Sequence, residues 1–411
     1  MNLEFFIARR IITSKDHKSN ISAPIIKIAI TAIVLGFVVM LVSIATGVGL
    51  QKKIKEKVSA FNGDIVITNY DTNFSNDSGI PISINQPFYP EFKSVNGIRH
   101  VQATALKGGV IRTETDFEGV VVKGVGADYN WEYFEEFLTE GNLPDLSGDL
   151  NSESLISQYL ANRLGFKVGD KVRTYFLNTD SSKAPRSRAF VVSGIYDSGF
   201  LEFDQQFMMA DIRHVQRLNN WEDTLVGSFE LFVEDFDEIN EVANQVYTEI
   251  PSDLDAVSIR DKYYSIFEWT DLFDFNIALI IGIMILVAGI NMITALLVLI
   301  LERTQMIGIL KALGSTDWSV RKVFLYNAMY LIGVGLFWGN LIGIGLLLIQ
   351  KYFKVITLNP QTYYVTEAPV YFDVGYIVLL NIGTFLLCLV MLLVPSYIIS
   401  KISPVKAIRF E

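Results

Sequence analysis

The chain has 411 residues, of which 51% are apolar and 19% charged, and its formal net charge is −10. This apolar excess is too large for an ordinary soluble protein, and the acidic balance argues against a nucleic-acid partner. The only cysteine, Cys388, excludes a framework of internal disulfides.

The apolar residues gather in four long runs that have no charged side chain in their interiors. Each run is at least as long as the roughly 20 residues that a helix needs to cross a membrane. The runs are residues 28–50, 275–301, 323–349 and 374–399. The sequence therefore predicts an α-helical membrane protein with four transmembrane helices.

Basic residues indicate how these helices are oriented, because short cytoplasmic segments are enriched in Lys and Arg. Lys and Arg are frequent in residues 1–27, 302–322 and 400–411, whereas residues 350–373 hold only Lys351 and Lys354. We therefore expect both termini in the cytoplasm. The short loop 350–373 is expected on the opposite side of the membrane.

Residues 51–274, between the first two runs, are expected on that same, extracytoplasmic side. Their apolar residues alternate between the periods of strands and helices, which predicts a large α+β domain. Helical spacing at both ends of this region predicts that the first two membrane helices continue outward as stalks. The segments "DKVRTYF" and "AFVVSGIYD" are expected to pair as strands. Helical spacing within residues 1–27 predicts a short helix at the membrane interface.

Three glycines of the third run recur at every fourth residue: Gly335, Gly339 and Gly343. This spacing places small residues on one face of a helix, where another helix can approach closely. Packing within the chain and packing across a dimer would use this face equally well.

Enzymatic chemistry is not indicated by the sequence. The three histidines, His17, His100 and His214, are scattered, and neither an HExxH zinc motif nor a GxxxxGK[ST] phosphate-binding loop occurs. We therefore predict no catalytic, cofactor-binding or metal-binding residue in this chain. If ATP and Mg²⁺ are involved, we expect a partner subunit to bind them.

The segment "ERTQMIGILKALGSTDWSV", residues 302–320, combines an apolar stripe of Met306, Ile309, Leu310 and Leu313 with two capping signals. Gly314 is suited to end one helix, and Ser315 or Thr316 to begin the next. The segment resembles the cytoplasmic loop of the FtsX-like superfamily of ABC transporter permeases, where it forms a coupling helix that docks into the ATPase. The resemblance implies this role for Arg303, Met306, Ile307, Gly308, Leu310, Lys311, Leu313 and Gly314. A helix lying on the lipid surface is the alternative.

Further segments resemble the lipoprotein-releasing (Lol-type) permeases of that superfamily. They are "FFIARRI" at the start, "ANRLGFKVGDKVRTYF" and "AFVVSGIYDSGFLEFDQQFMMADI" in the domain, and "PVKAIRFE" at the end. The resemblance implies a permease of the mechanotransmission type that releases lipoproteins from the inner membrane. It also implies the partners: an ABC ATPase dimer, a second permease copy or paralogue, the lipoprotein cargo and a periplasmic carrier.

In Lol-type permeases a hairpin between two strands of the domain captures the carrier. The corresponding residues 177–188 are short, so an ordinary loop is as good an interpretation as a docking site formed by Lys183, Pro185, Arg186 and Arg188. Two other roles stay open. One is an FtsX- or MacB-like permease that regulates a cell-wall hydrolase or exports peptides or drugs, and the other is a scaffold without transport activity.

Overall fold

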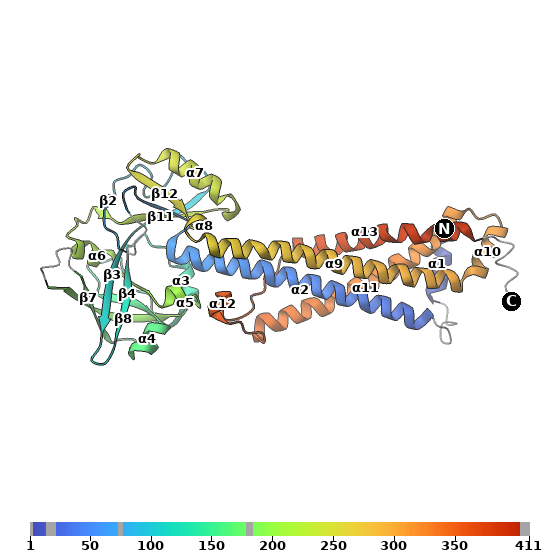
Figure 1. Ribbon diagram of the computed structural model, residues 1–411, viewed down its shortest axis with the longest axis horizontal. Helices are drawn as coiled ribbons and strands as arrows, with labels where there is room; N and C mark the ends of the chain where they lie inside the picture. The colour runs from blue at the N-terminus through green and yellow to red at the C-terminus, as the bar shows by residue number, and fades with distance from the viewer. Residues whose placement is uncertain (1–2, 14–21, 73–76, 178–183, 403–411) are drawn as a thin grey trace. The chain divides into compact units, whose positions relative to one another are not determined.

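A computed structural model describes the chain apart from residues 1–2, 14–21, 73–76, 178–183 and 403–411 (Figure 1). The chain divides into two compact units. The first, called the membrane unit here, is drawn from residues 1–51, 270–357 and 368–411. The second, called the α+β domain, is drawn from residues 52–269 and 358–367.

In the described part of the chain, four helices are long and apolar enough to cross a membrane. They are α2 (Ser22–Asn62), α9 (Tyr264–Glu302), α11 (Asp317–Phe353) and α13 (Val374–Ser396), the last continued by α14 (Ile398–Lys401). Together with the α+β domain after the first of them, they confirm the predicted fold class. Both α2 and α9 extend past their apolar runs and supply residues to both units.

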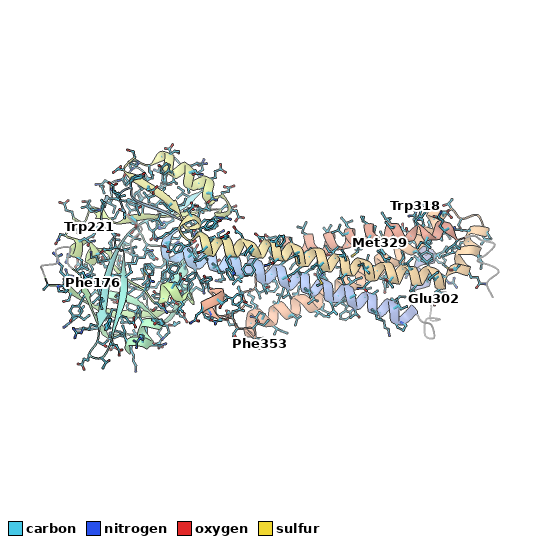
Figure 2. The ribbon with its side chains drawn as sticks, in the orientation of Figure 1. Phe176, Trp221, Glu302, Trp318, Met329 and Phe353 are labelled. Atoms are coloured by element: carbon cyan, nitrogen blue, oxygen red, sulfur yellow. The ribbon has the colours of Figure 1, made fainter. Side chains whose placement is uncertain are left out.

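Two shorter helices complete the membrane unit: α1 (Leu3–Thr13) and α10 (Thr304–Ala312). Figure 2 shows that Glu302, where α9 ends, and Trp318, in the first turn of α11, lie at the same end of this unit. Phe353, the last residue of α11, lies at the other end. The chain therefore passes from α9 through α10 into α11 at one end of the helical bundle.

The glycine face of α11 packs against α2 within the same chain. A Cβ atom built on each glycine would lie 2.7–3.1 Å from a large side chain of α2, tighter than nine in ten real Cβ contacts. The pairs are Gly335 with Ile33, Gly339 with Phe37, and Gly343 with Leu41. Since the α2 residues also recur every fourth position, the two helices interlock along one line.

A pair of amides joins α11 to α13 inside the apolar bundle. The Nδ2 atom of Asn340 donates to Oδ1 of Asn381 at 2.7 Å, and Nδ2 of Asn381 donates back to Oδ1 of Asn340 at 3.1 Å. Each amide also donates to a carbonyl of its own helix, that of Leu336 or Ile377. Because an unpaired amide in an apolar environment is costly, this reciprocal pairing holds the two helices in one register.

The α+β domain is built on a ten-stranded sheet with the order β12-β1-β11-β3-β4-β9-β6-β8-β5, and β7 pairs with both β3 and β8. The antiparallel pairing of β7 with β8 confirms the predicted strand pair. The strands are β1 (Ile65–Asn69), β3 (Ile98–Arg112), β4 (Phe117–Val125), β5 (Leu138–Gly141), β6 (Glu153–Ser157), β7 (Lys171–Phe176), β8 (Arg186–Tyr196), β9 (Phe207–Asp211), β11 (Ser228–Val233) and β12 (Leu254–Ser258).

A second, two-stranded sheet joins β2 (Ile82–Ser83) to β10 (Leu225–Val226). The helices of the domain are α3 (Glu132–Phe137), α4 (Gln158–Leu164), α5 (Leu201–Asp204), α6 (Ile212–Asn219), α7 (Ile239–Glu249), α8 (Ile259–Lys262) and α12 (Pro360–Tyr363), with a 3₁₀ turn, η2 (Phe236–Glu238). One core cluster of the domain fills the space between the sheet and helices α4 and α6, with Phe190, Met208 and Val215 fully buried in it.

The segment between α11 and α13, expected as one short loop, is divided between the two units. Residues 358–367, including α12, belong to the α+β domain, whereas 350–357 and 368–373 belong to the membrane unit. The side chain of Gln350 donates to the carbonyls of Ile356 and Ala368 and accepts from the N–H of Ile356. The amide of Gln350 therefore joins the two stretches of chain that flank residues 358–367.

The glycine line predicts a position-dependent loss of stability. Replacing Gly335 by Val places a branched side chain against Ile33, and overpacking of this kind costs about 1–3 kcal/mol. Gly333→Val on the same helix is the matched control, because nothing lies within 4 Å of a Cβ built there. Thermal unfolding of the purified protein in detergent should show a lower midpoint for Gly335→Val alone. Equal midpoints for the two variants would contradict this packing.

Candidate functional site

Helix α10 is bounded by its own local sequence. At its start the Oγ1 atom of Thr304 donates to the carbonyls of Ile300 and Leu301. At its end Gly314 has φ +93°, its N–H donates to Lys311 O, and the N–H of Ser315 donates to Leu310 O. This is the Schellman pattern of a glycine C-cap, as the sequence predicts.

The next helix begins directly after this turn. The side chain of Thr316 accepts from the N–H of Ser319 at 3.2 Å and so caps α11, one of the two alternatives that the sequence left open. A helix of nine residues is thus held between two defined ends, Arg303 and Gly314. The sequence of the turn therefore determines where α10 ends and where α11 begins.

The apolar stripe expected on α10 divides into two parts in the structure. Met306 and Leu310 pack against the core of the membrane unit, beside the buried Ile307 and Gly308. Ile309 is 46% exposed and Leu313 79% exposed. The second part is the more exposed one, and four of the residues expected in docking, Met306, Ile307, Gly308 and Leu310, are buried or partly buried.

Lys311 also points inward, and its side chain is 8% exposed. Its Nζ atom donates to the carbonyls of Ile399 at 2.7 Å and Ile402 at 3.0 Å, and forms an ion pair with Asp317 at 2.8 Å. Arg303 lies between α9 and α10, at the N-cap position of α10. The structure therefore brings the motif residues together on one short helix, with different faces serving different contacts.

Helix α1 packs beside the start of α11. The carboxylate of Glu4 accepts from Oγ of Ser319 at 2.8 Å, and the ring of Phe5 meets that of Tyr326 edge to face. Ala8 and Ile11 are buried in the membrane unit, whereas Arg9 and Arg10 are exposed. A helix forms in this segment as predicted, and it contacts α11; its place at the membrane interface stays a prediction.

Three of the four residues proposed for carrier docking are described, and their surroundings differ. Arg186 at the start of β8 donates to the carbonyls of Arg217 and Leu218 and to Oδ1 of Asn220, so it caps the end of α6. Arg188 is half-buried and Pro185 is exposed. Lys183 lies outside the described residues.

Comparison with known proteins identifies the family. A family model described as MacB-like periplasmic core domain matches residues 28–250, more than half of the chain. A model described as FtsX-like permease C-terminal matches residues 278–404, which include α10. The chain belongs to the FtsX- and MacB-like ABC transporter permeases. Membership implies an ABC ATPase and a second permease as partners, and a bacterial inner membrane as the location.

The relatives of this permease include proteins that have different names. The "Lipoprotein-releasing system transmembrane protein LolC" of Neisseria meningitidis serogroup B is 25% identical over 430 residues and covers 100% of both chains. The "Uncharacterized ABC transporter permease YknZ" of Bacillus subtilis is 24% identical over 328 residues, 76% of this chain and 79% of the relative. The solved periplasmic region of MacB from Actinobacillus actinomycetemcomitans is 13% identical, with a TM-score of 0.33, covering 50% of this chain and 92% of that one.

The α+β domain of the permease contains a cluster of one lysine and three aromatic side chains that the sequence did not reveal. Lys57 on α2 is 7% exposed and donates from Nζ to the carbonyl of Tyr364 at 3.1 Å. The ring of Tyr364 stacks on Phe200 at 4.7 Å and meets Trp269 edge to face at 5.8 Å. Through Tyr364, this cluster attaches the segment 358–367 to α2 and α9. No local motif signals it, since its members are distant in sequence.

Asp204 lies close to this cluster and is 4% exposed. Burial raises its pKa to about 7, although the hydroxyl of Ser198 donates to its Oδ1 atom at 2.6 Å and stabilises the carboxylate. Burial likewise lowers the pKa of Lys57 to about 8, against the attraction of Asp204. The domain therefore contains two buried groups, Asp204 and Lys57, whose pKa values lie near neutral pH.

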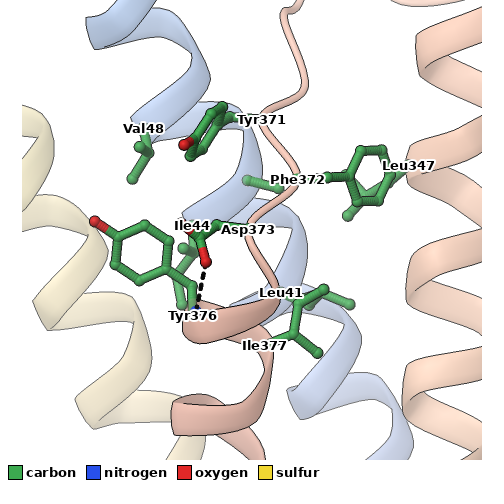
Figure 3. A pocket seen from close by; sticks show the side chains of 10 residues that line it. Leu41, Ile44, Val48, Leu347, Tyr371, Phe372, Asp373, Tyr376 and Ile377 are labelled. Carbon is green, nitrogen blue, oxygen red and sulfur yellow. Dashed lines mark hydrogen bonds between the residues drawn. The ribbon is translucent and has the colours of Figure 1, made fainter.

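A small hollow in the membrane unit lies between α2 and the start of α13 (Figure 3). The N–H of Tyr371 donates to the carbonyl of Ala45, and a Cβ on Gly49 would lie 2.9 Å from the carbonyl oxygen of Pro369. The carboxylate of Asp373 accepts from the N–H groups of Gly375 and Tyr376 and caps α13. Apart from this engaged carboxylate the lining is apolar and aromatic: Leu41, Ile44, Ala45, Val48, Leu347, Tyr371, Phe372, Tyr376 and Ile377. The hollow is therefore a packing feature of the helix ends.

Asp204 predicts how the stability of the domain depends on pH. A carboxyl group whose folded-state pKa is raised stabilises the fold fully below its unfolded value, near 4, and this stability is lost as pH rises through about 7. The temperature at the midpoint of thermal unfolding of the domain, measured in the full-length protein, should therefore decrease as the pH is raised from 5 to 8. In Asp204→Asn this pH dependence should be weaker, because a contribution on the order of a few kcal/mol to the free energy of unfolding no longer changes with pH.

Asp253 is exposed, so Asp253→Asn is the matched control, and its midpoint should depend on pH as that of the wild type does. The cause assigned to the slope is wrong if Asp204→Asn retains it. Lys57, whose pKa is about 8, titrates at the upper end of this range, and its titration raises stability as the pH rises. The slopes are therefore compared between pH 5 and pH 7.

Proposed function

We propose that this chain is the permease subunit of a lipoprotein-releasing ABC transporter of the mechanotransmission type. The observation that carries the proposal is the full-length similarity to a LolC protein, which covers membrane helices and domain alike. In this proposal α10 faces the cytoplasm, and the α+β domain lies in the periplasm, as the distribution of Lys and Arg predicts.

The ATPase subunit docks on the exposed part of α10. Ile309 and Leu313 are four residues apart, so they lie on one face of the helix, and Trp318 in the next helix is 51% exposed. An amphipathic helix that inserts such a face into a groove is a common mode of protein recognition. Because Ile307, Met306 and Leu310 pack against the membrane unit, the docking face has a firm support.

Movement reaches the domain through α2 and α9, each of which has residues in both units. No residue of this chain is assigned to ATP hydrolysis, and ATP and Mg²⁺ bind to the partner subunit in this proposal. The permease converts closure of two ATPase subunits into displacement of helices. A second copy of this chain or a paralogue completes the transporter.

The energetics of the cargo require a receiver. Burial of an acyl chain contributes about 0.8 kcal/mol per CH₂, so a lipoprotein with three long chains gains roughly 30 kcal/mol or more from the membrane. This exceeds the practical limit of about 20 kcal/mol for non-covalent binding. The cargo therefore passes directly to an apolar pocket of a periplasmic carrier.

Where the carrier docks stays a prediction for the β7–β8 connection. Arg186 is already engaged as the cap of α6, which leaves Pro185 and Arg188 as the described residues that a carrier could contact. Because the connection is short, carrier docking elsewhere on the domain is compatible with the proposal.

A second candidate keeps the permease and changes its output. It is a permease that exports peptides or drugs or regulates a cell-wall hydrolase, and the match of residues 28–250 to a MacB-like periplasmic core domain is compatible with it. The two candidates share the ATPase and α10 and differ in what the α+β domain acts on.

The double substitution Ile309→Asp and Leu313→Asp tests both levels of the proposal. It places charges on the docking face, so the ATPase subunit should no longer co-purify, and acylated lipoproteins should accumulate in the inner membrane. Leu313→Met, which keeps an apolar side chain there, is the control and should behave as wild type. Retention of the ATPase by the double variant would refute the docking face. Loss of the ATPase with normal lipoprotein release would favour the second candidate.

A further inference from the structure

The end of the last membrane helix lies against the coupling segment. Helix α13 ends at Ser396, directly after Pro395, and α14 (Ile398–Lys401) adds one more turn. The last carbonyl groups of a helix have no partner within the helix, and they attract cations. In this membrane unit two basic side chains, one from α10 and one from α11, bind to this end.

Lys311 is the basic residue from α10. A lysine ammonium has three donors. Here they reach Ile399 O at 2.7 Å, Ile402 O at 3.0 Å and the carboxylate of Asp317 at 2.8 Å, and Ser400 O lies at 3.5 Å. With these three partners and 8% exposure, the ammonium has no donor left for a second protein.

Arg321 is the basic residue from α11. Its Nη2 atom donates to Ser396 Oγ at 3.0 Å and to Leu393 O at 3.2 Å, and Nε donates to the same hydroxyl at 3.2 Å. The Cζ atom of its guanidinium lies 5.3 Å from the ring centroid of Trp318 and 5.8 Å from that of Tyr397. The two basic residues thus bind neighbouring turns of the chain end, one on each side of Tyr397.

We propose that Lys311 and Arg321 are positioning residues that fasten α10 and the start of α11 to the end of α13, so that α10 cannot move without the last membrane helix. This inference rests on the proposed coupling role of α10. It reassigns Lys311, because a motif lysine that would be expected to contact the ATPase instead holds the permease together. Displacement received at Ile309 and Leu313 is then shared by three membrane helices: α9, α11 and α13.

The test compares Lys311→Met with Lys401→Met in the full-length transporter. Met keeps the length and apolar stem of Lys but cannot donate. Lys401 is exposed on α14, where its Nζ atom lies over the ring of Tyr397, and none of its described contacts is a hydrogen bond to the helix-end carbonyls, so it controls for loss of charge. Lys311→Met should keep the ATPase bound and hydrolysing ATP, while lipoprotein release per ATP falls at least tenfold. Lys401→Met should keep the wild-type ratio, and Lys311→Arg should restore most of it.

A second readout does not depend on the cargo. Spin labels at Ala312 and Ile398, both exposed, report the distance between α10 and α14 in a background with Cys388 replaced by Ser. The fastened pair should give one narrow distance with and without ATP, and Lys311→Met should broaden it and make it change with ATP. If Lys311→Met does not accumulate, Lys311→Gln, which retains a shorter donor, is measured in the same way.

The inference is overturned if Lys311→Met leaves both the distance and the release per ATP unchanged. It is also overturned if this variant loses the ATPase, because Lys311 would then belong to the docking face. A changed distance together with an unaltered lipoprotein pool would support the fastening and count against the lipoprotein cargo, so the two failures are distinguishable.

Discussion

The side-chain oxygen of Asn62 joins the two helices that enter the α+β domain. Asn62 is the last residue of α2, and its Oδ1 atom accepts from Nζ of Lys262 at 3.0 Å and from the hydroxyl of Tyr263 at 2.9 Å, directly before α9 begins. Its Nδ2 atom donates to the carbonyl of Val58. Asn62 therefore links the last turn of α2 to the residues that directly precede α9.

Buried charges tie this junction to the sheet. Lys123 on β4 is fully buried, and its Nζ atom donates to Phe61 O at 2.7 Å and pairs with Glu230 on β11 at 2.6 Å. Burial lowers the pKa of Lys123, and the attraction of Glu230 opposes this. Removing one partner of such a pair costs about 3–5 kcal/mol, since the other charge stays buried. The last turn of α2 is therefore fixed to the middle of the sheet and not only to its edge.

Features encoded in local sequence could be predicted. Hydropathy located the four membrane helices, Gly314 and Thr316 marked the turn after α10, and the alternation of residues 170–197 indicated a strand pair. The glycine spacing of α11 predicted a close helix contact, but only the structure shows that α2 of the same chain fills it.

Features that join distant segments could not be read in this way. Lys57 binds the backbone of a residue more than 300 positions away, and Arg186 caps a helix that begins 26 residues later. The inward direction of Lys311 was also hidden, because a helical stripe does not say which of its edges faces the rest of the protein. In each case at least one partner is a backbone carbonyl, which leaves no trace in residue type.

The most direct measurement is affinity purification of the full-length protein from gentle detergent, followed by mass spectrometry of the proteins that accompany it. The account predicts an ABC ATPase subunit together with acylated lipoproteins. An ATPase accompanied by a cell-wall hydrolase or an outer-membrane channel would contradict the lipoprotein cargo, and the absence of any ATPase would contradict the coupling role of α10 itself.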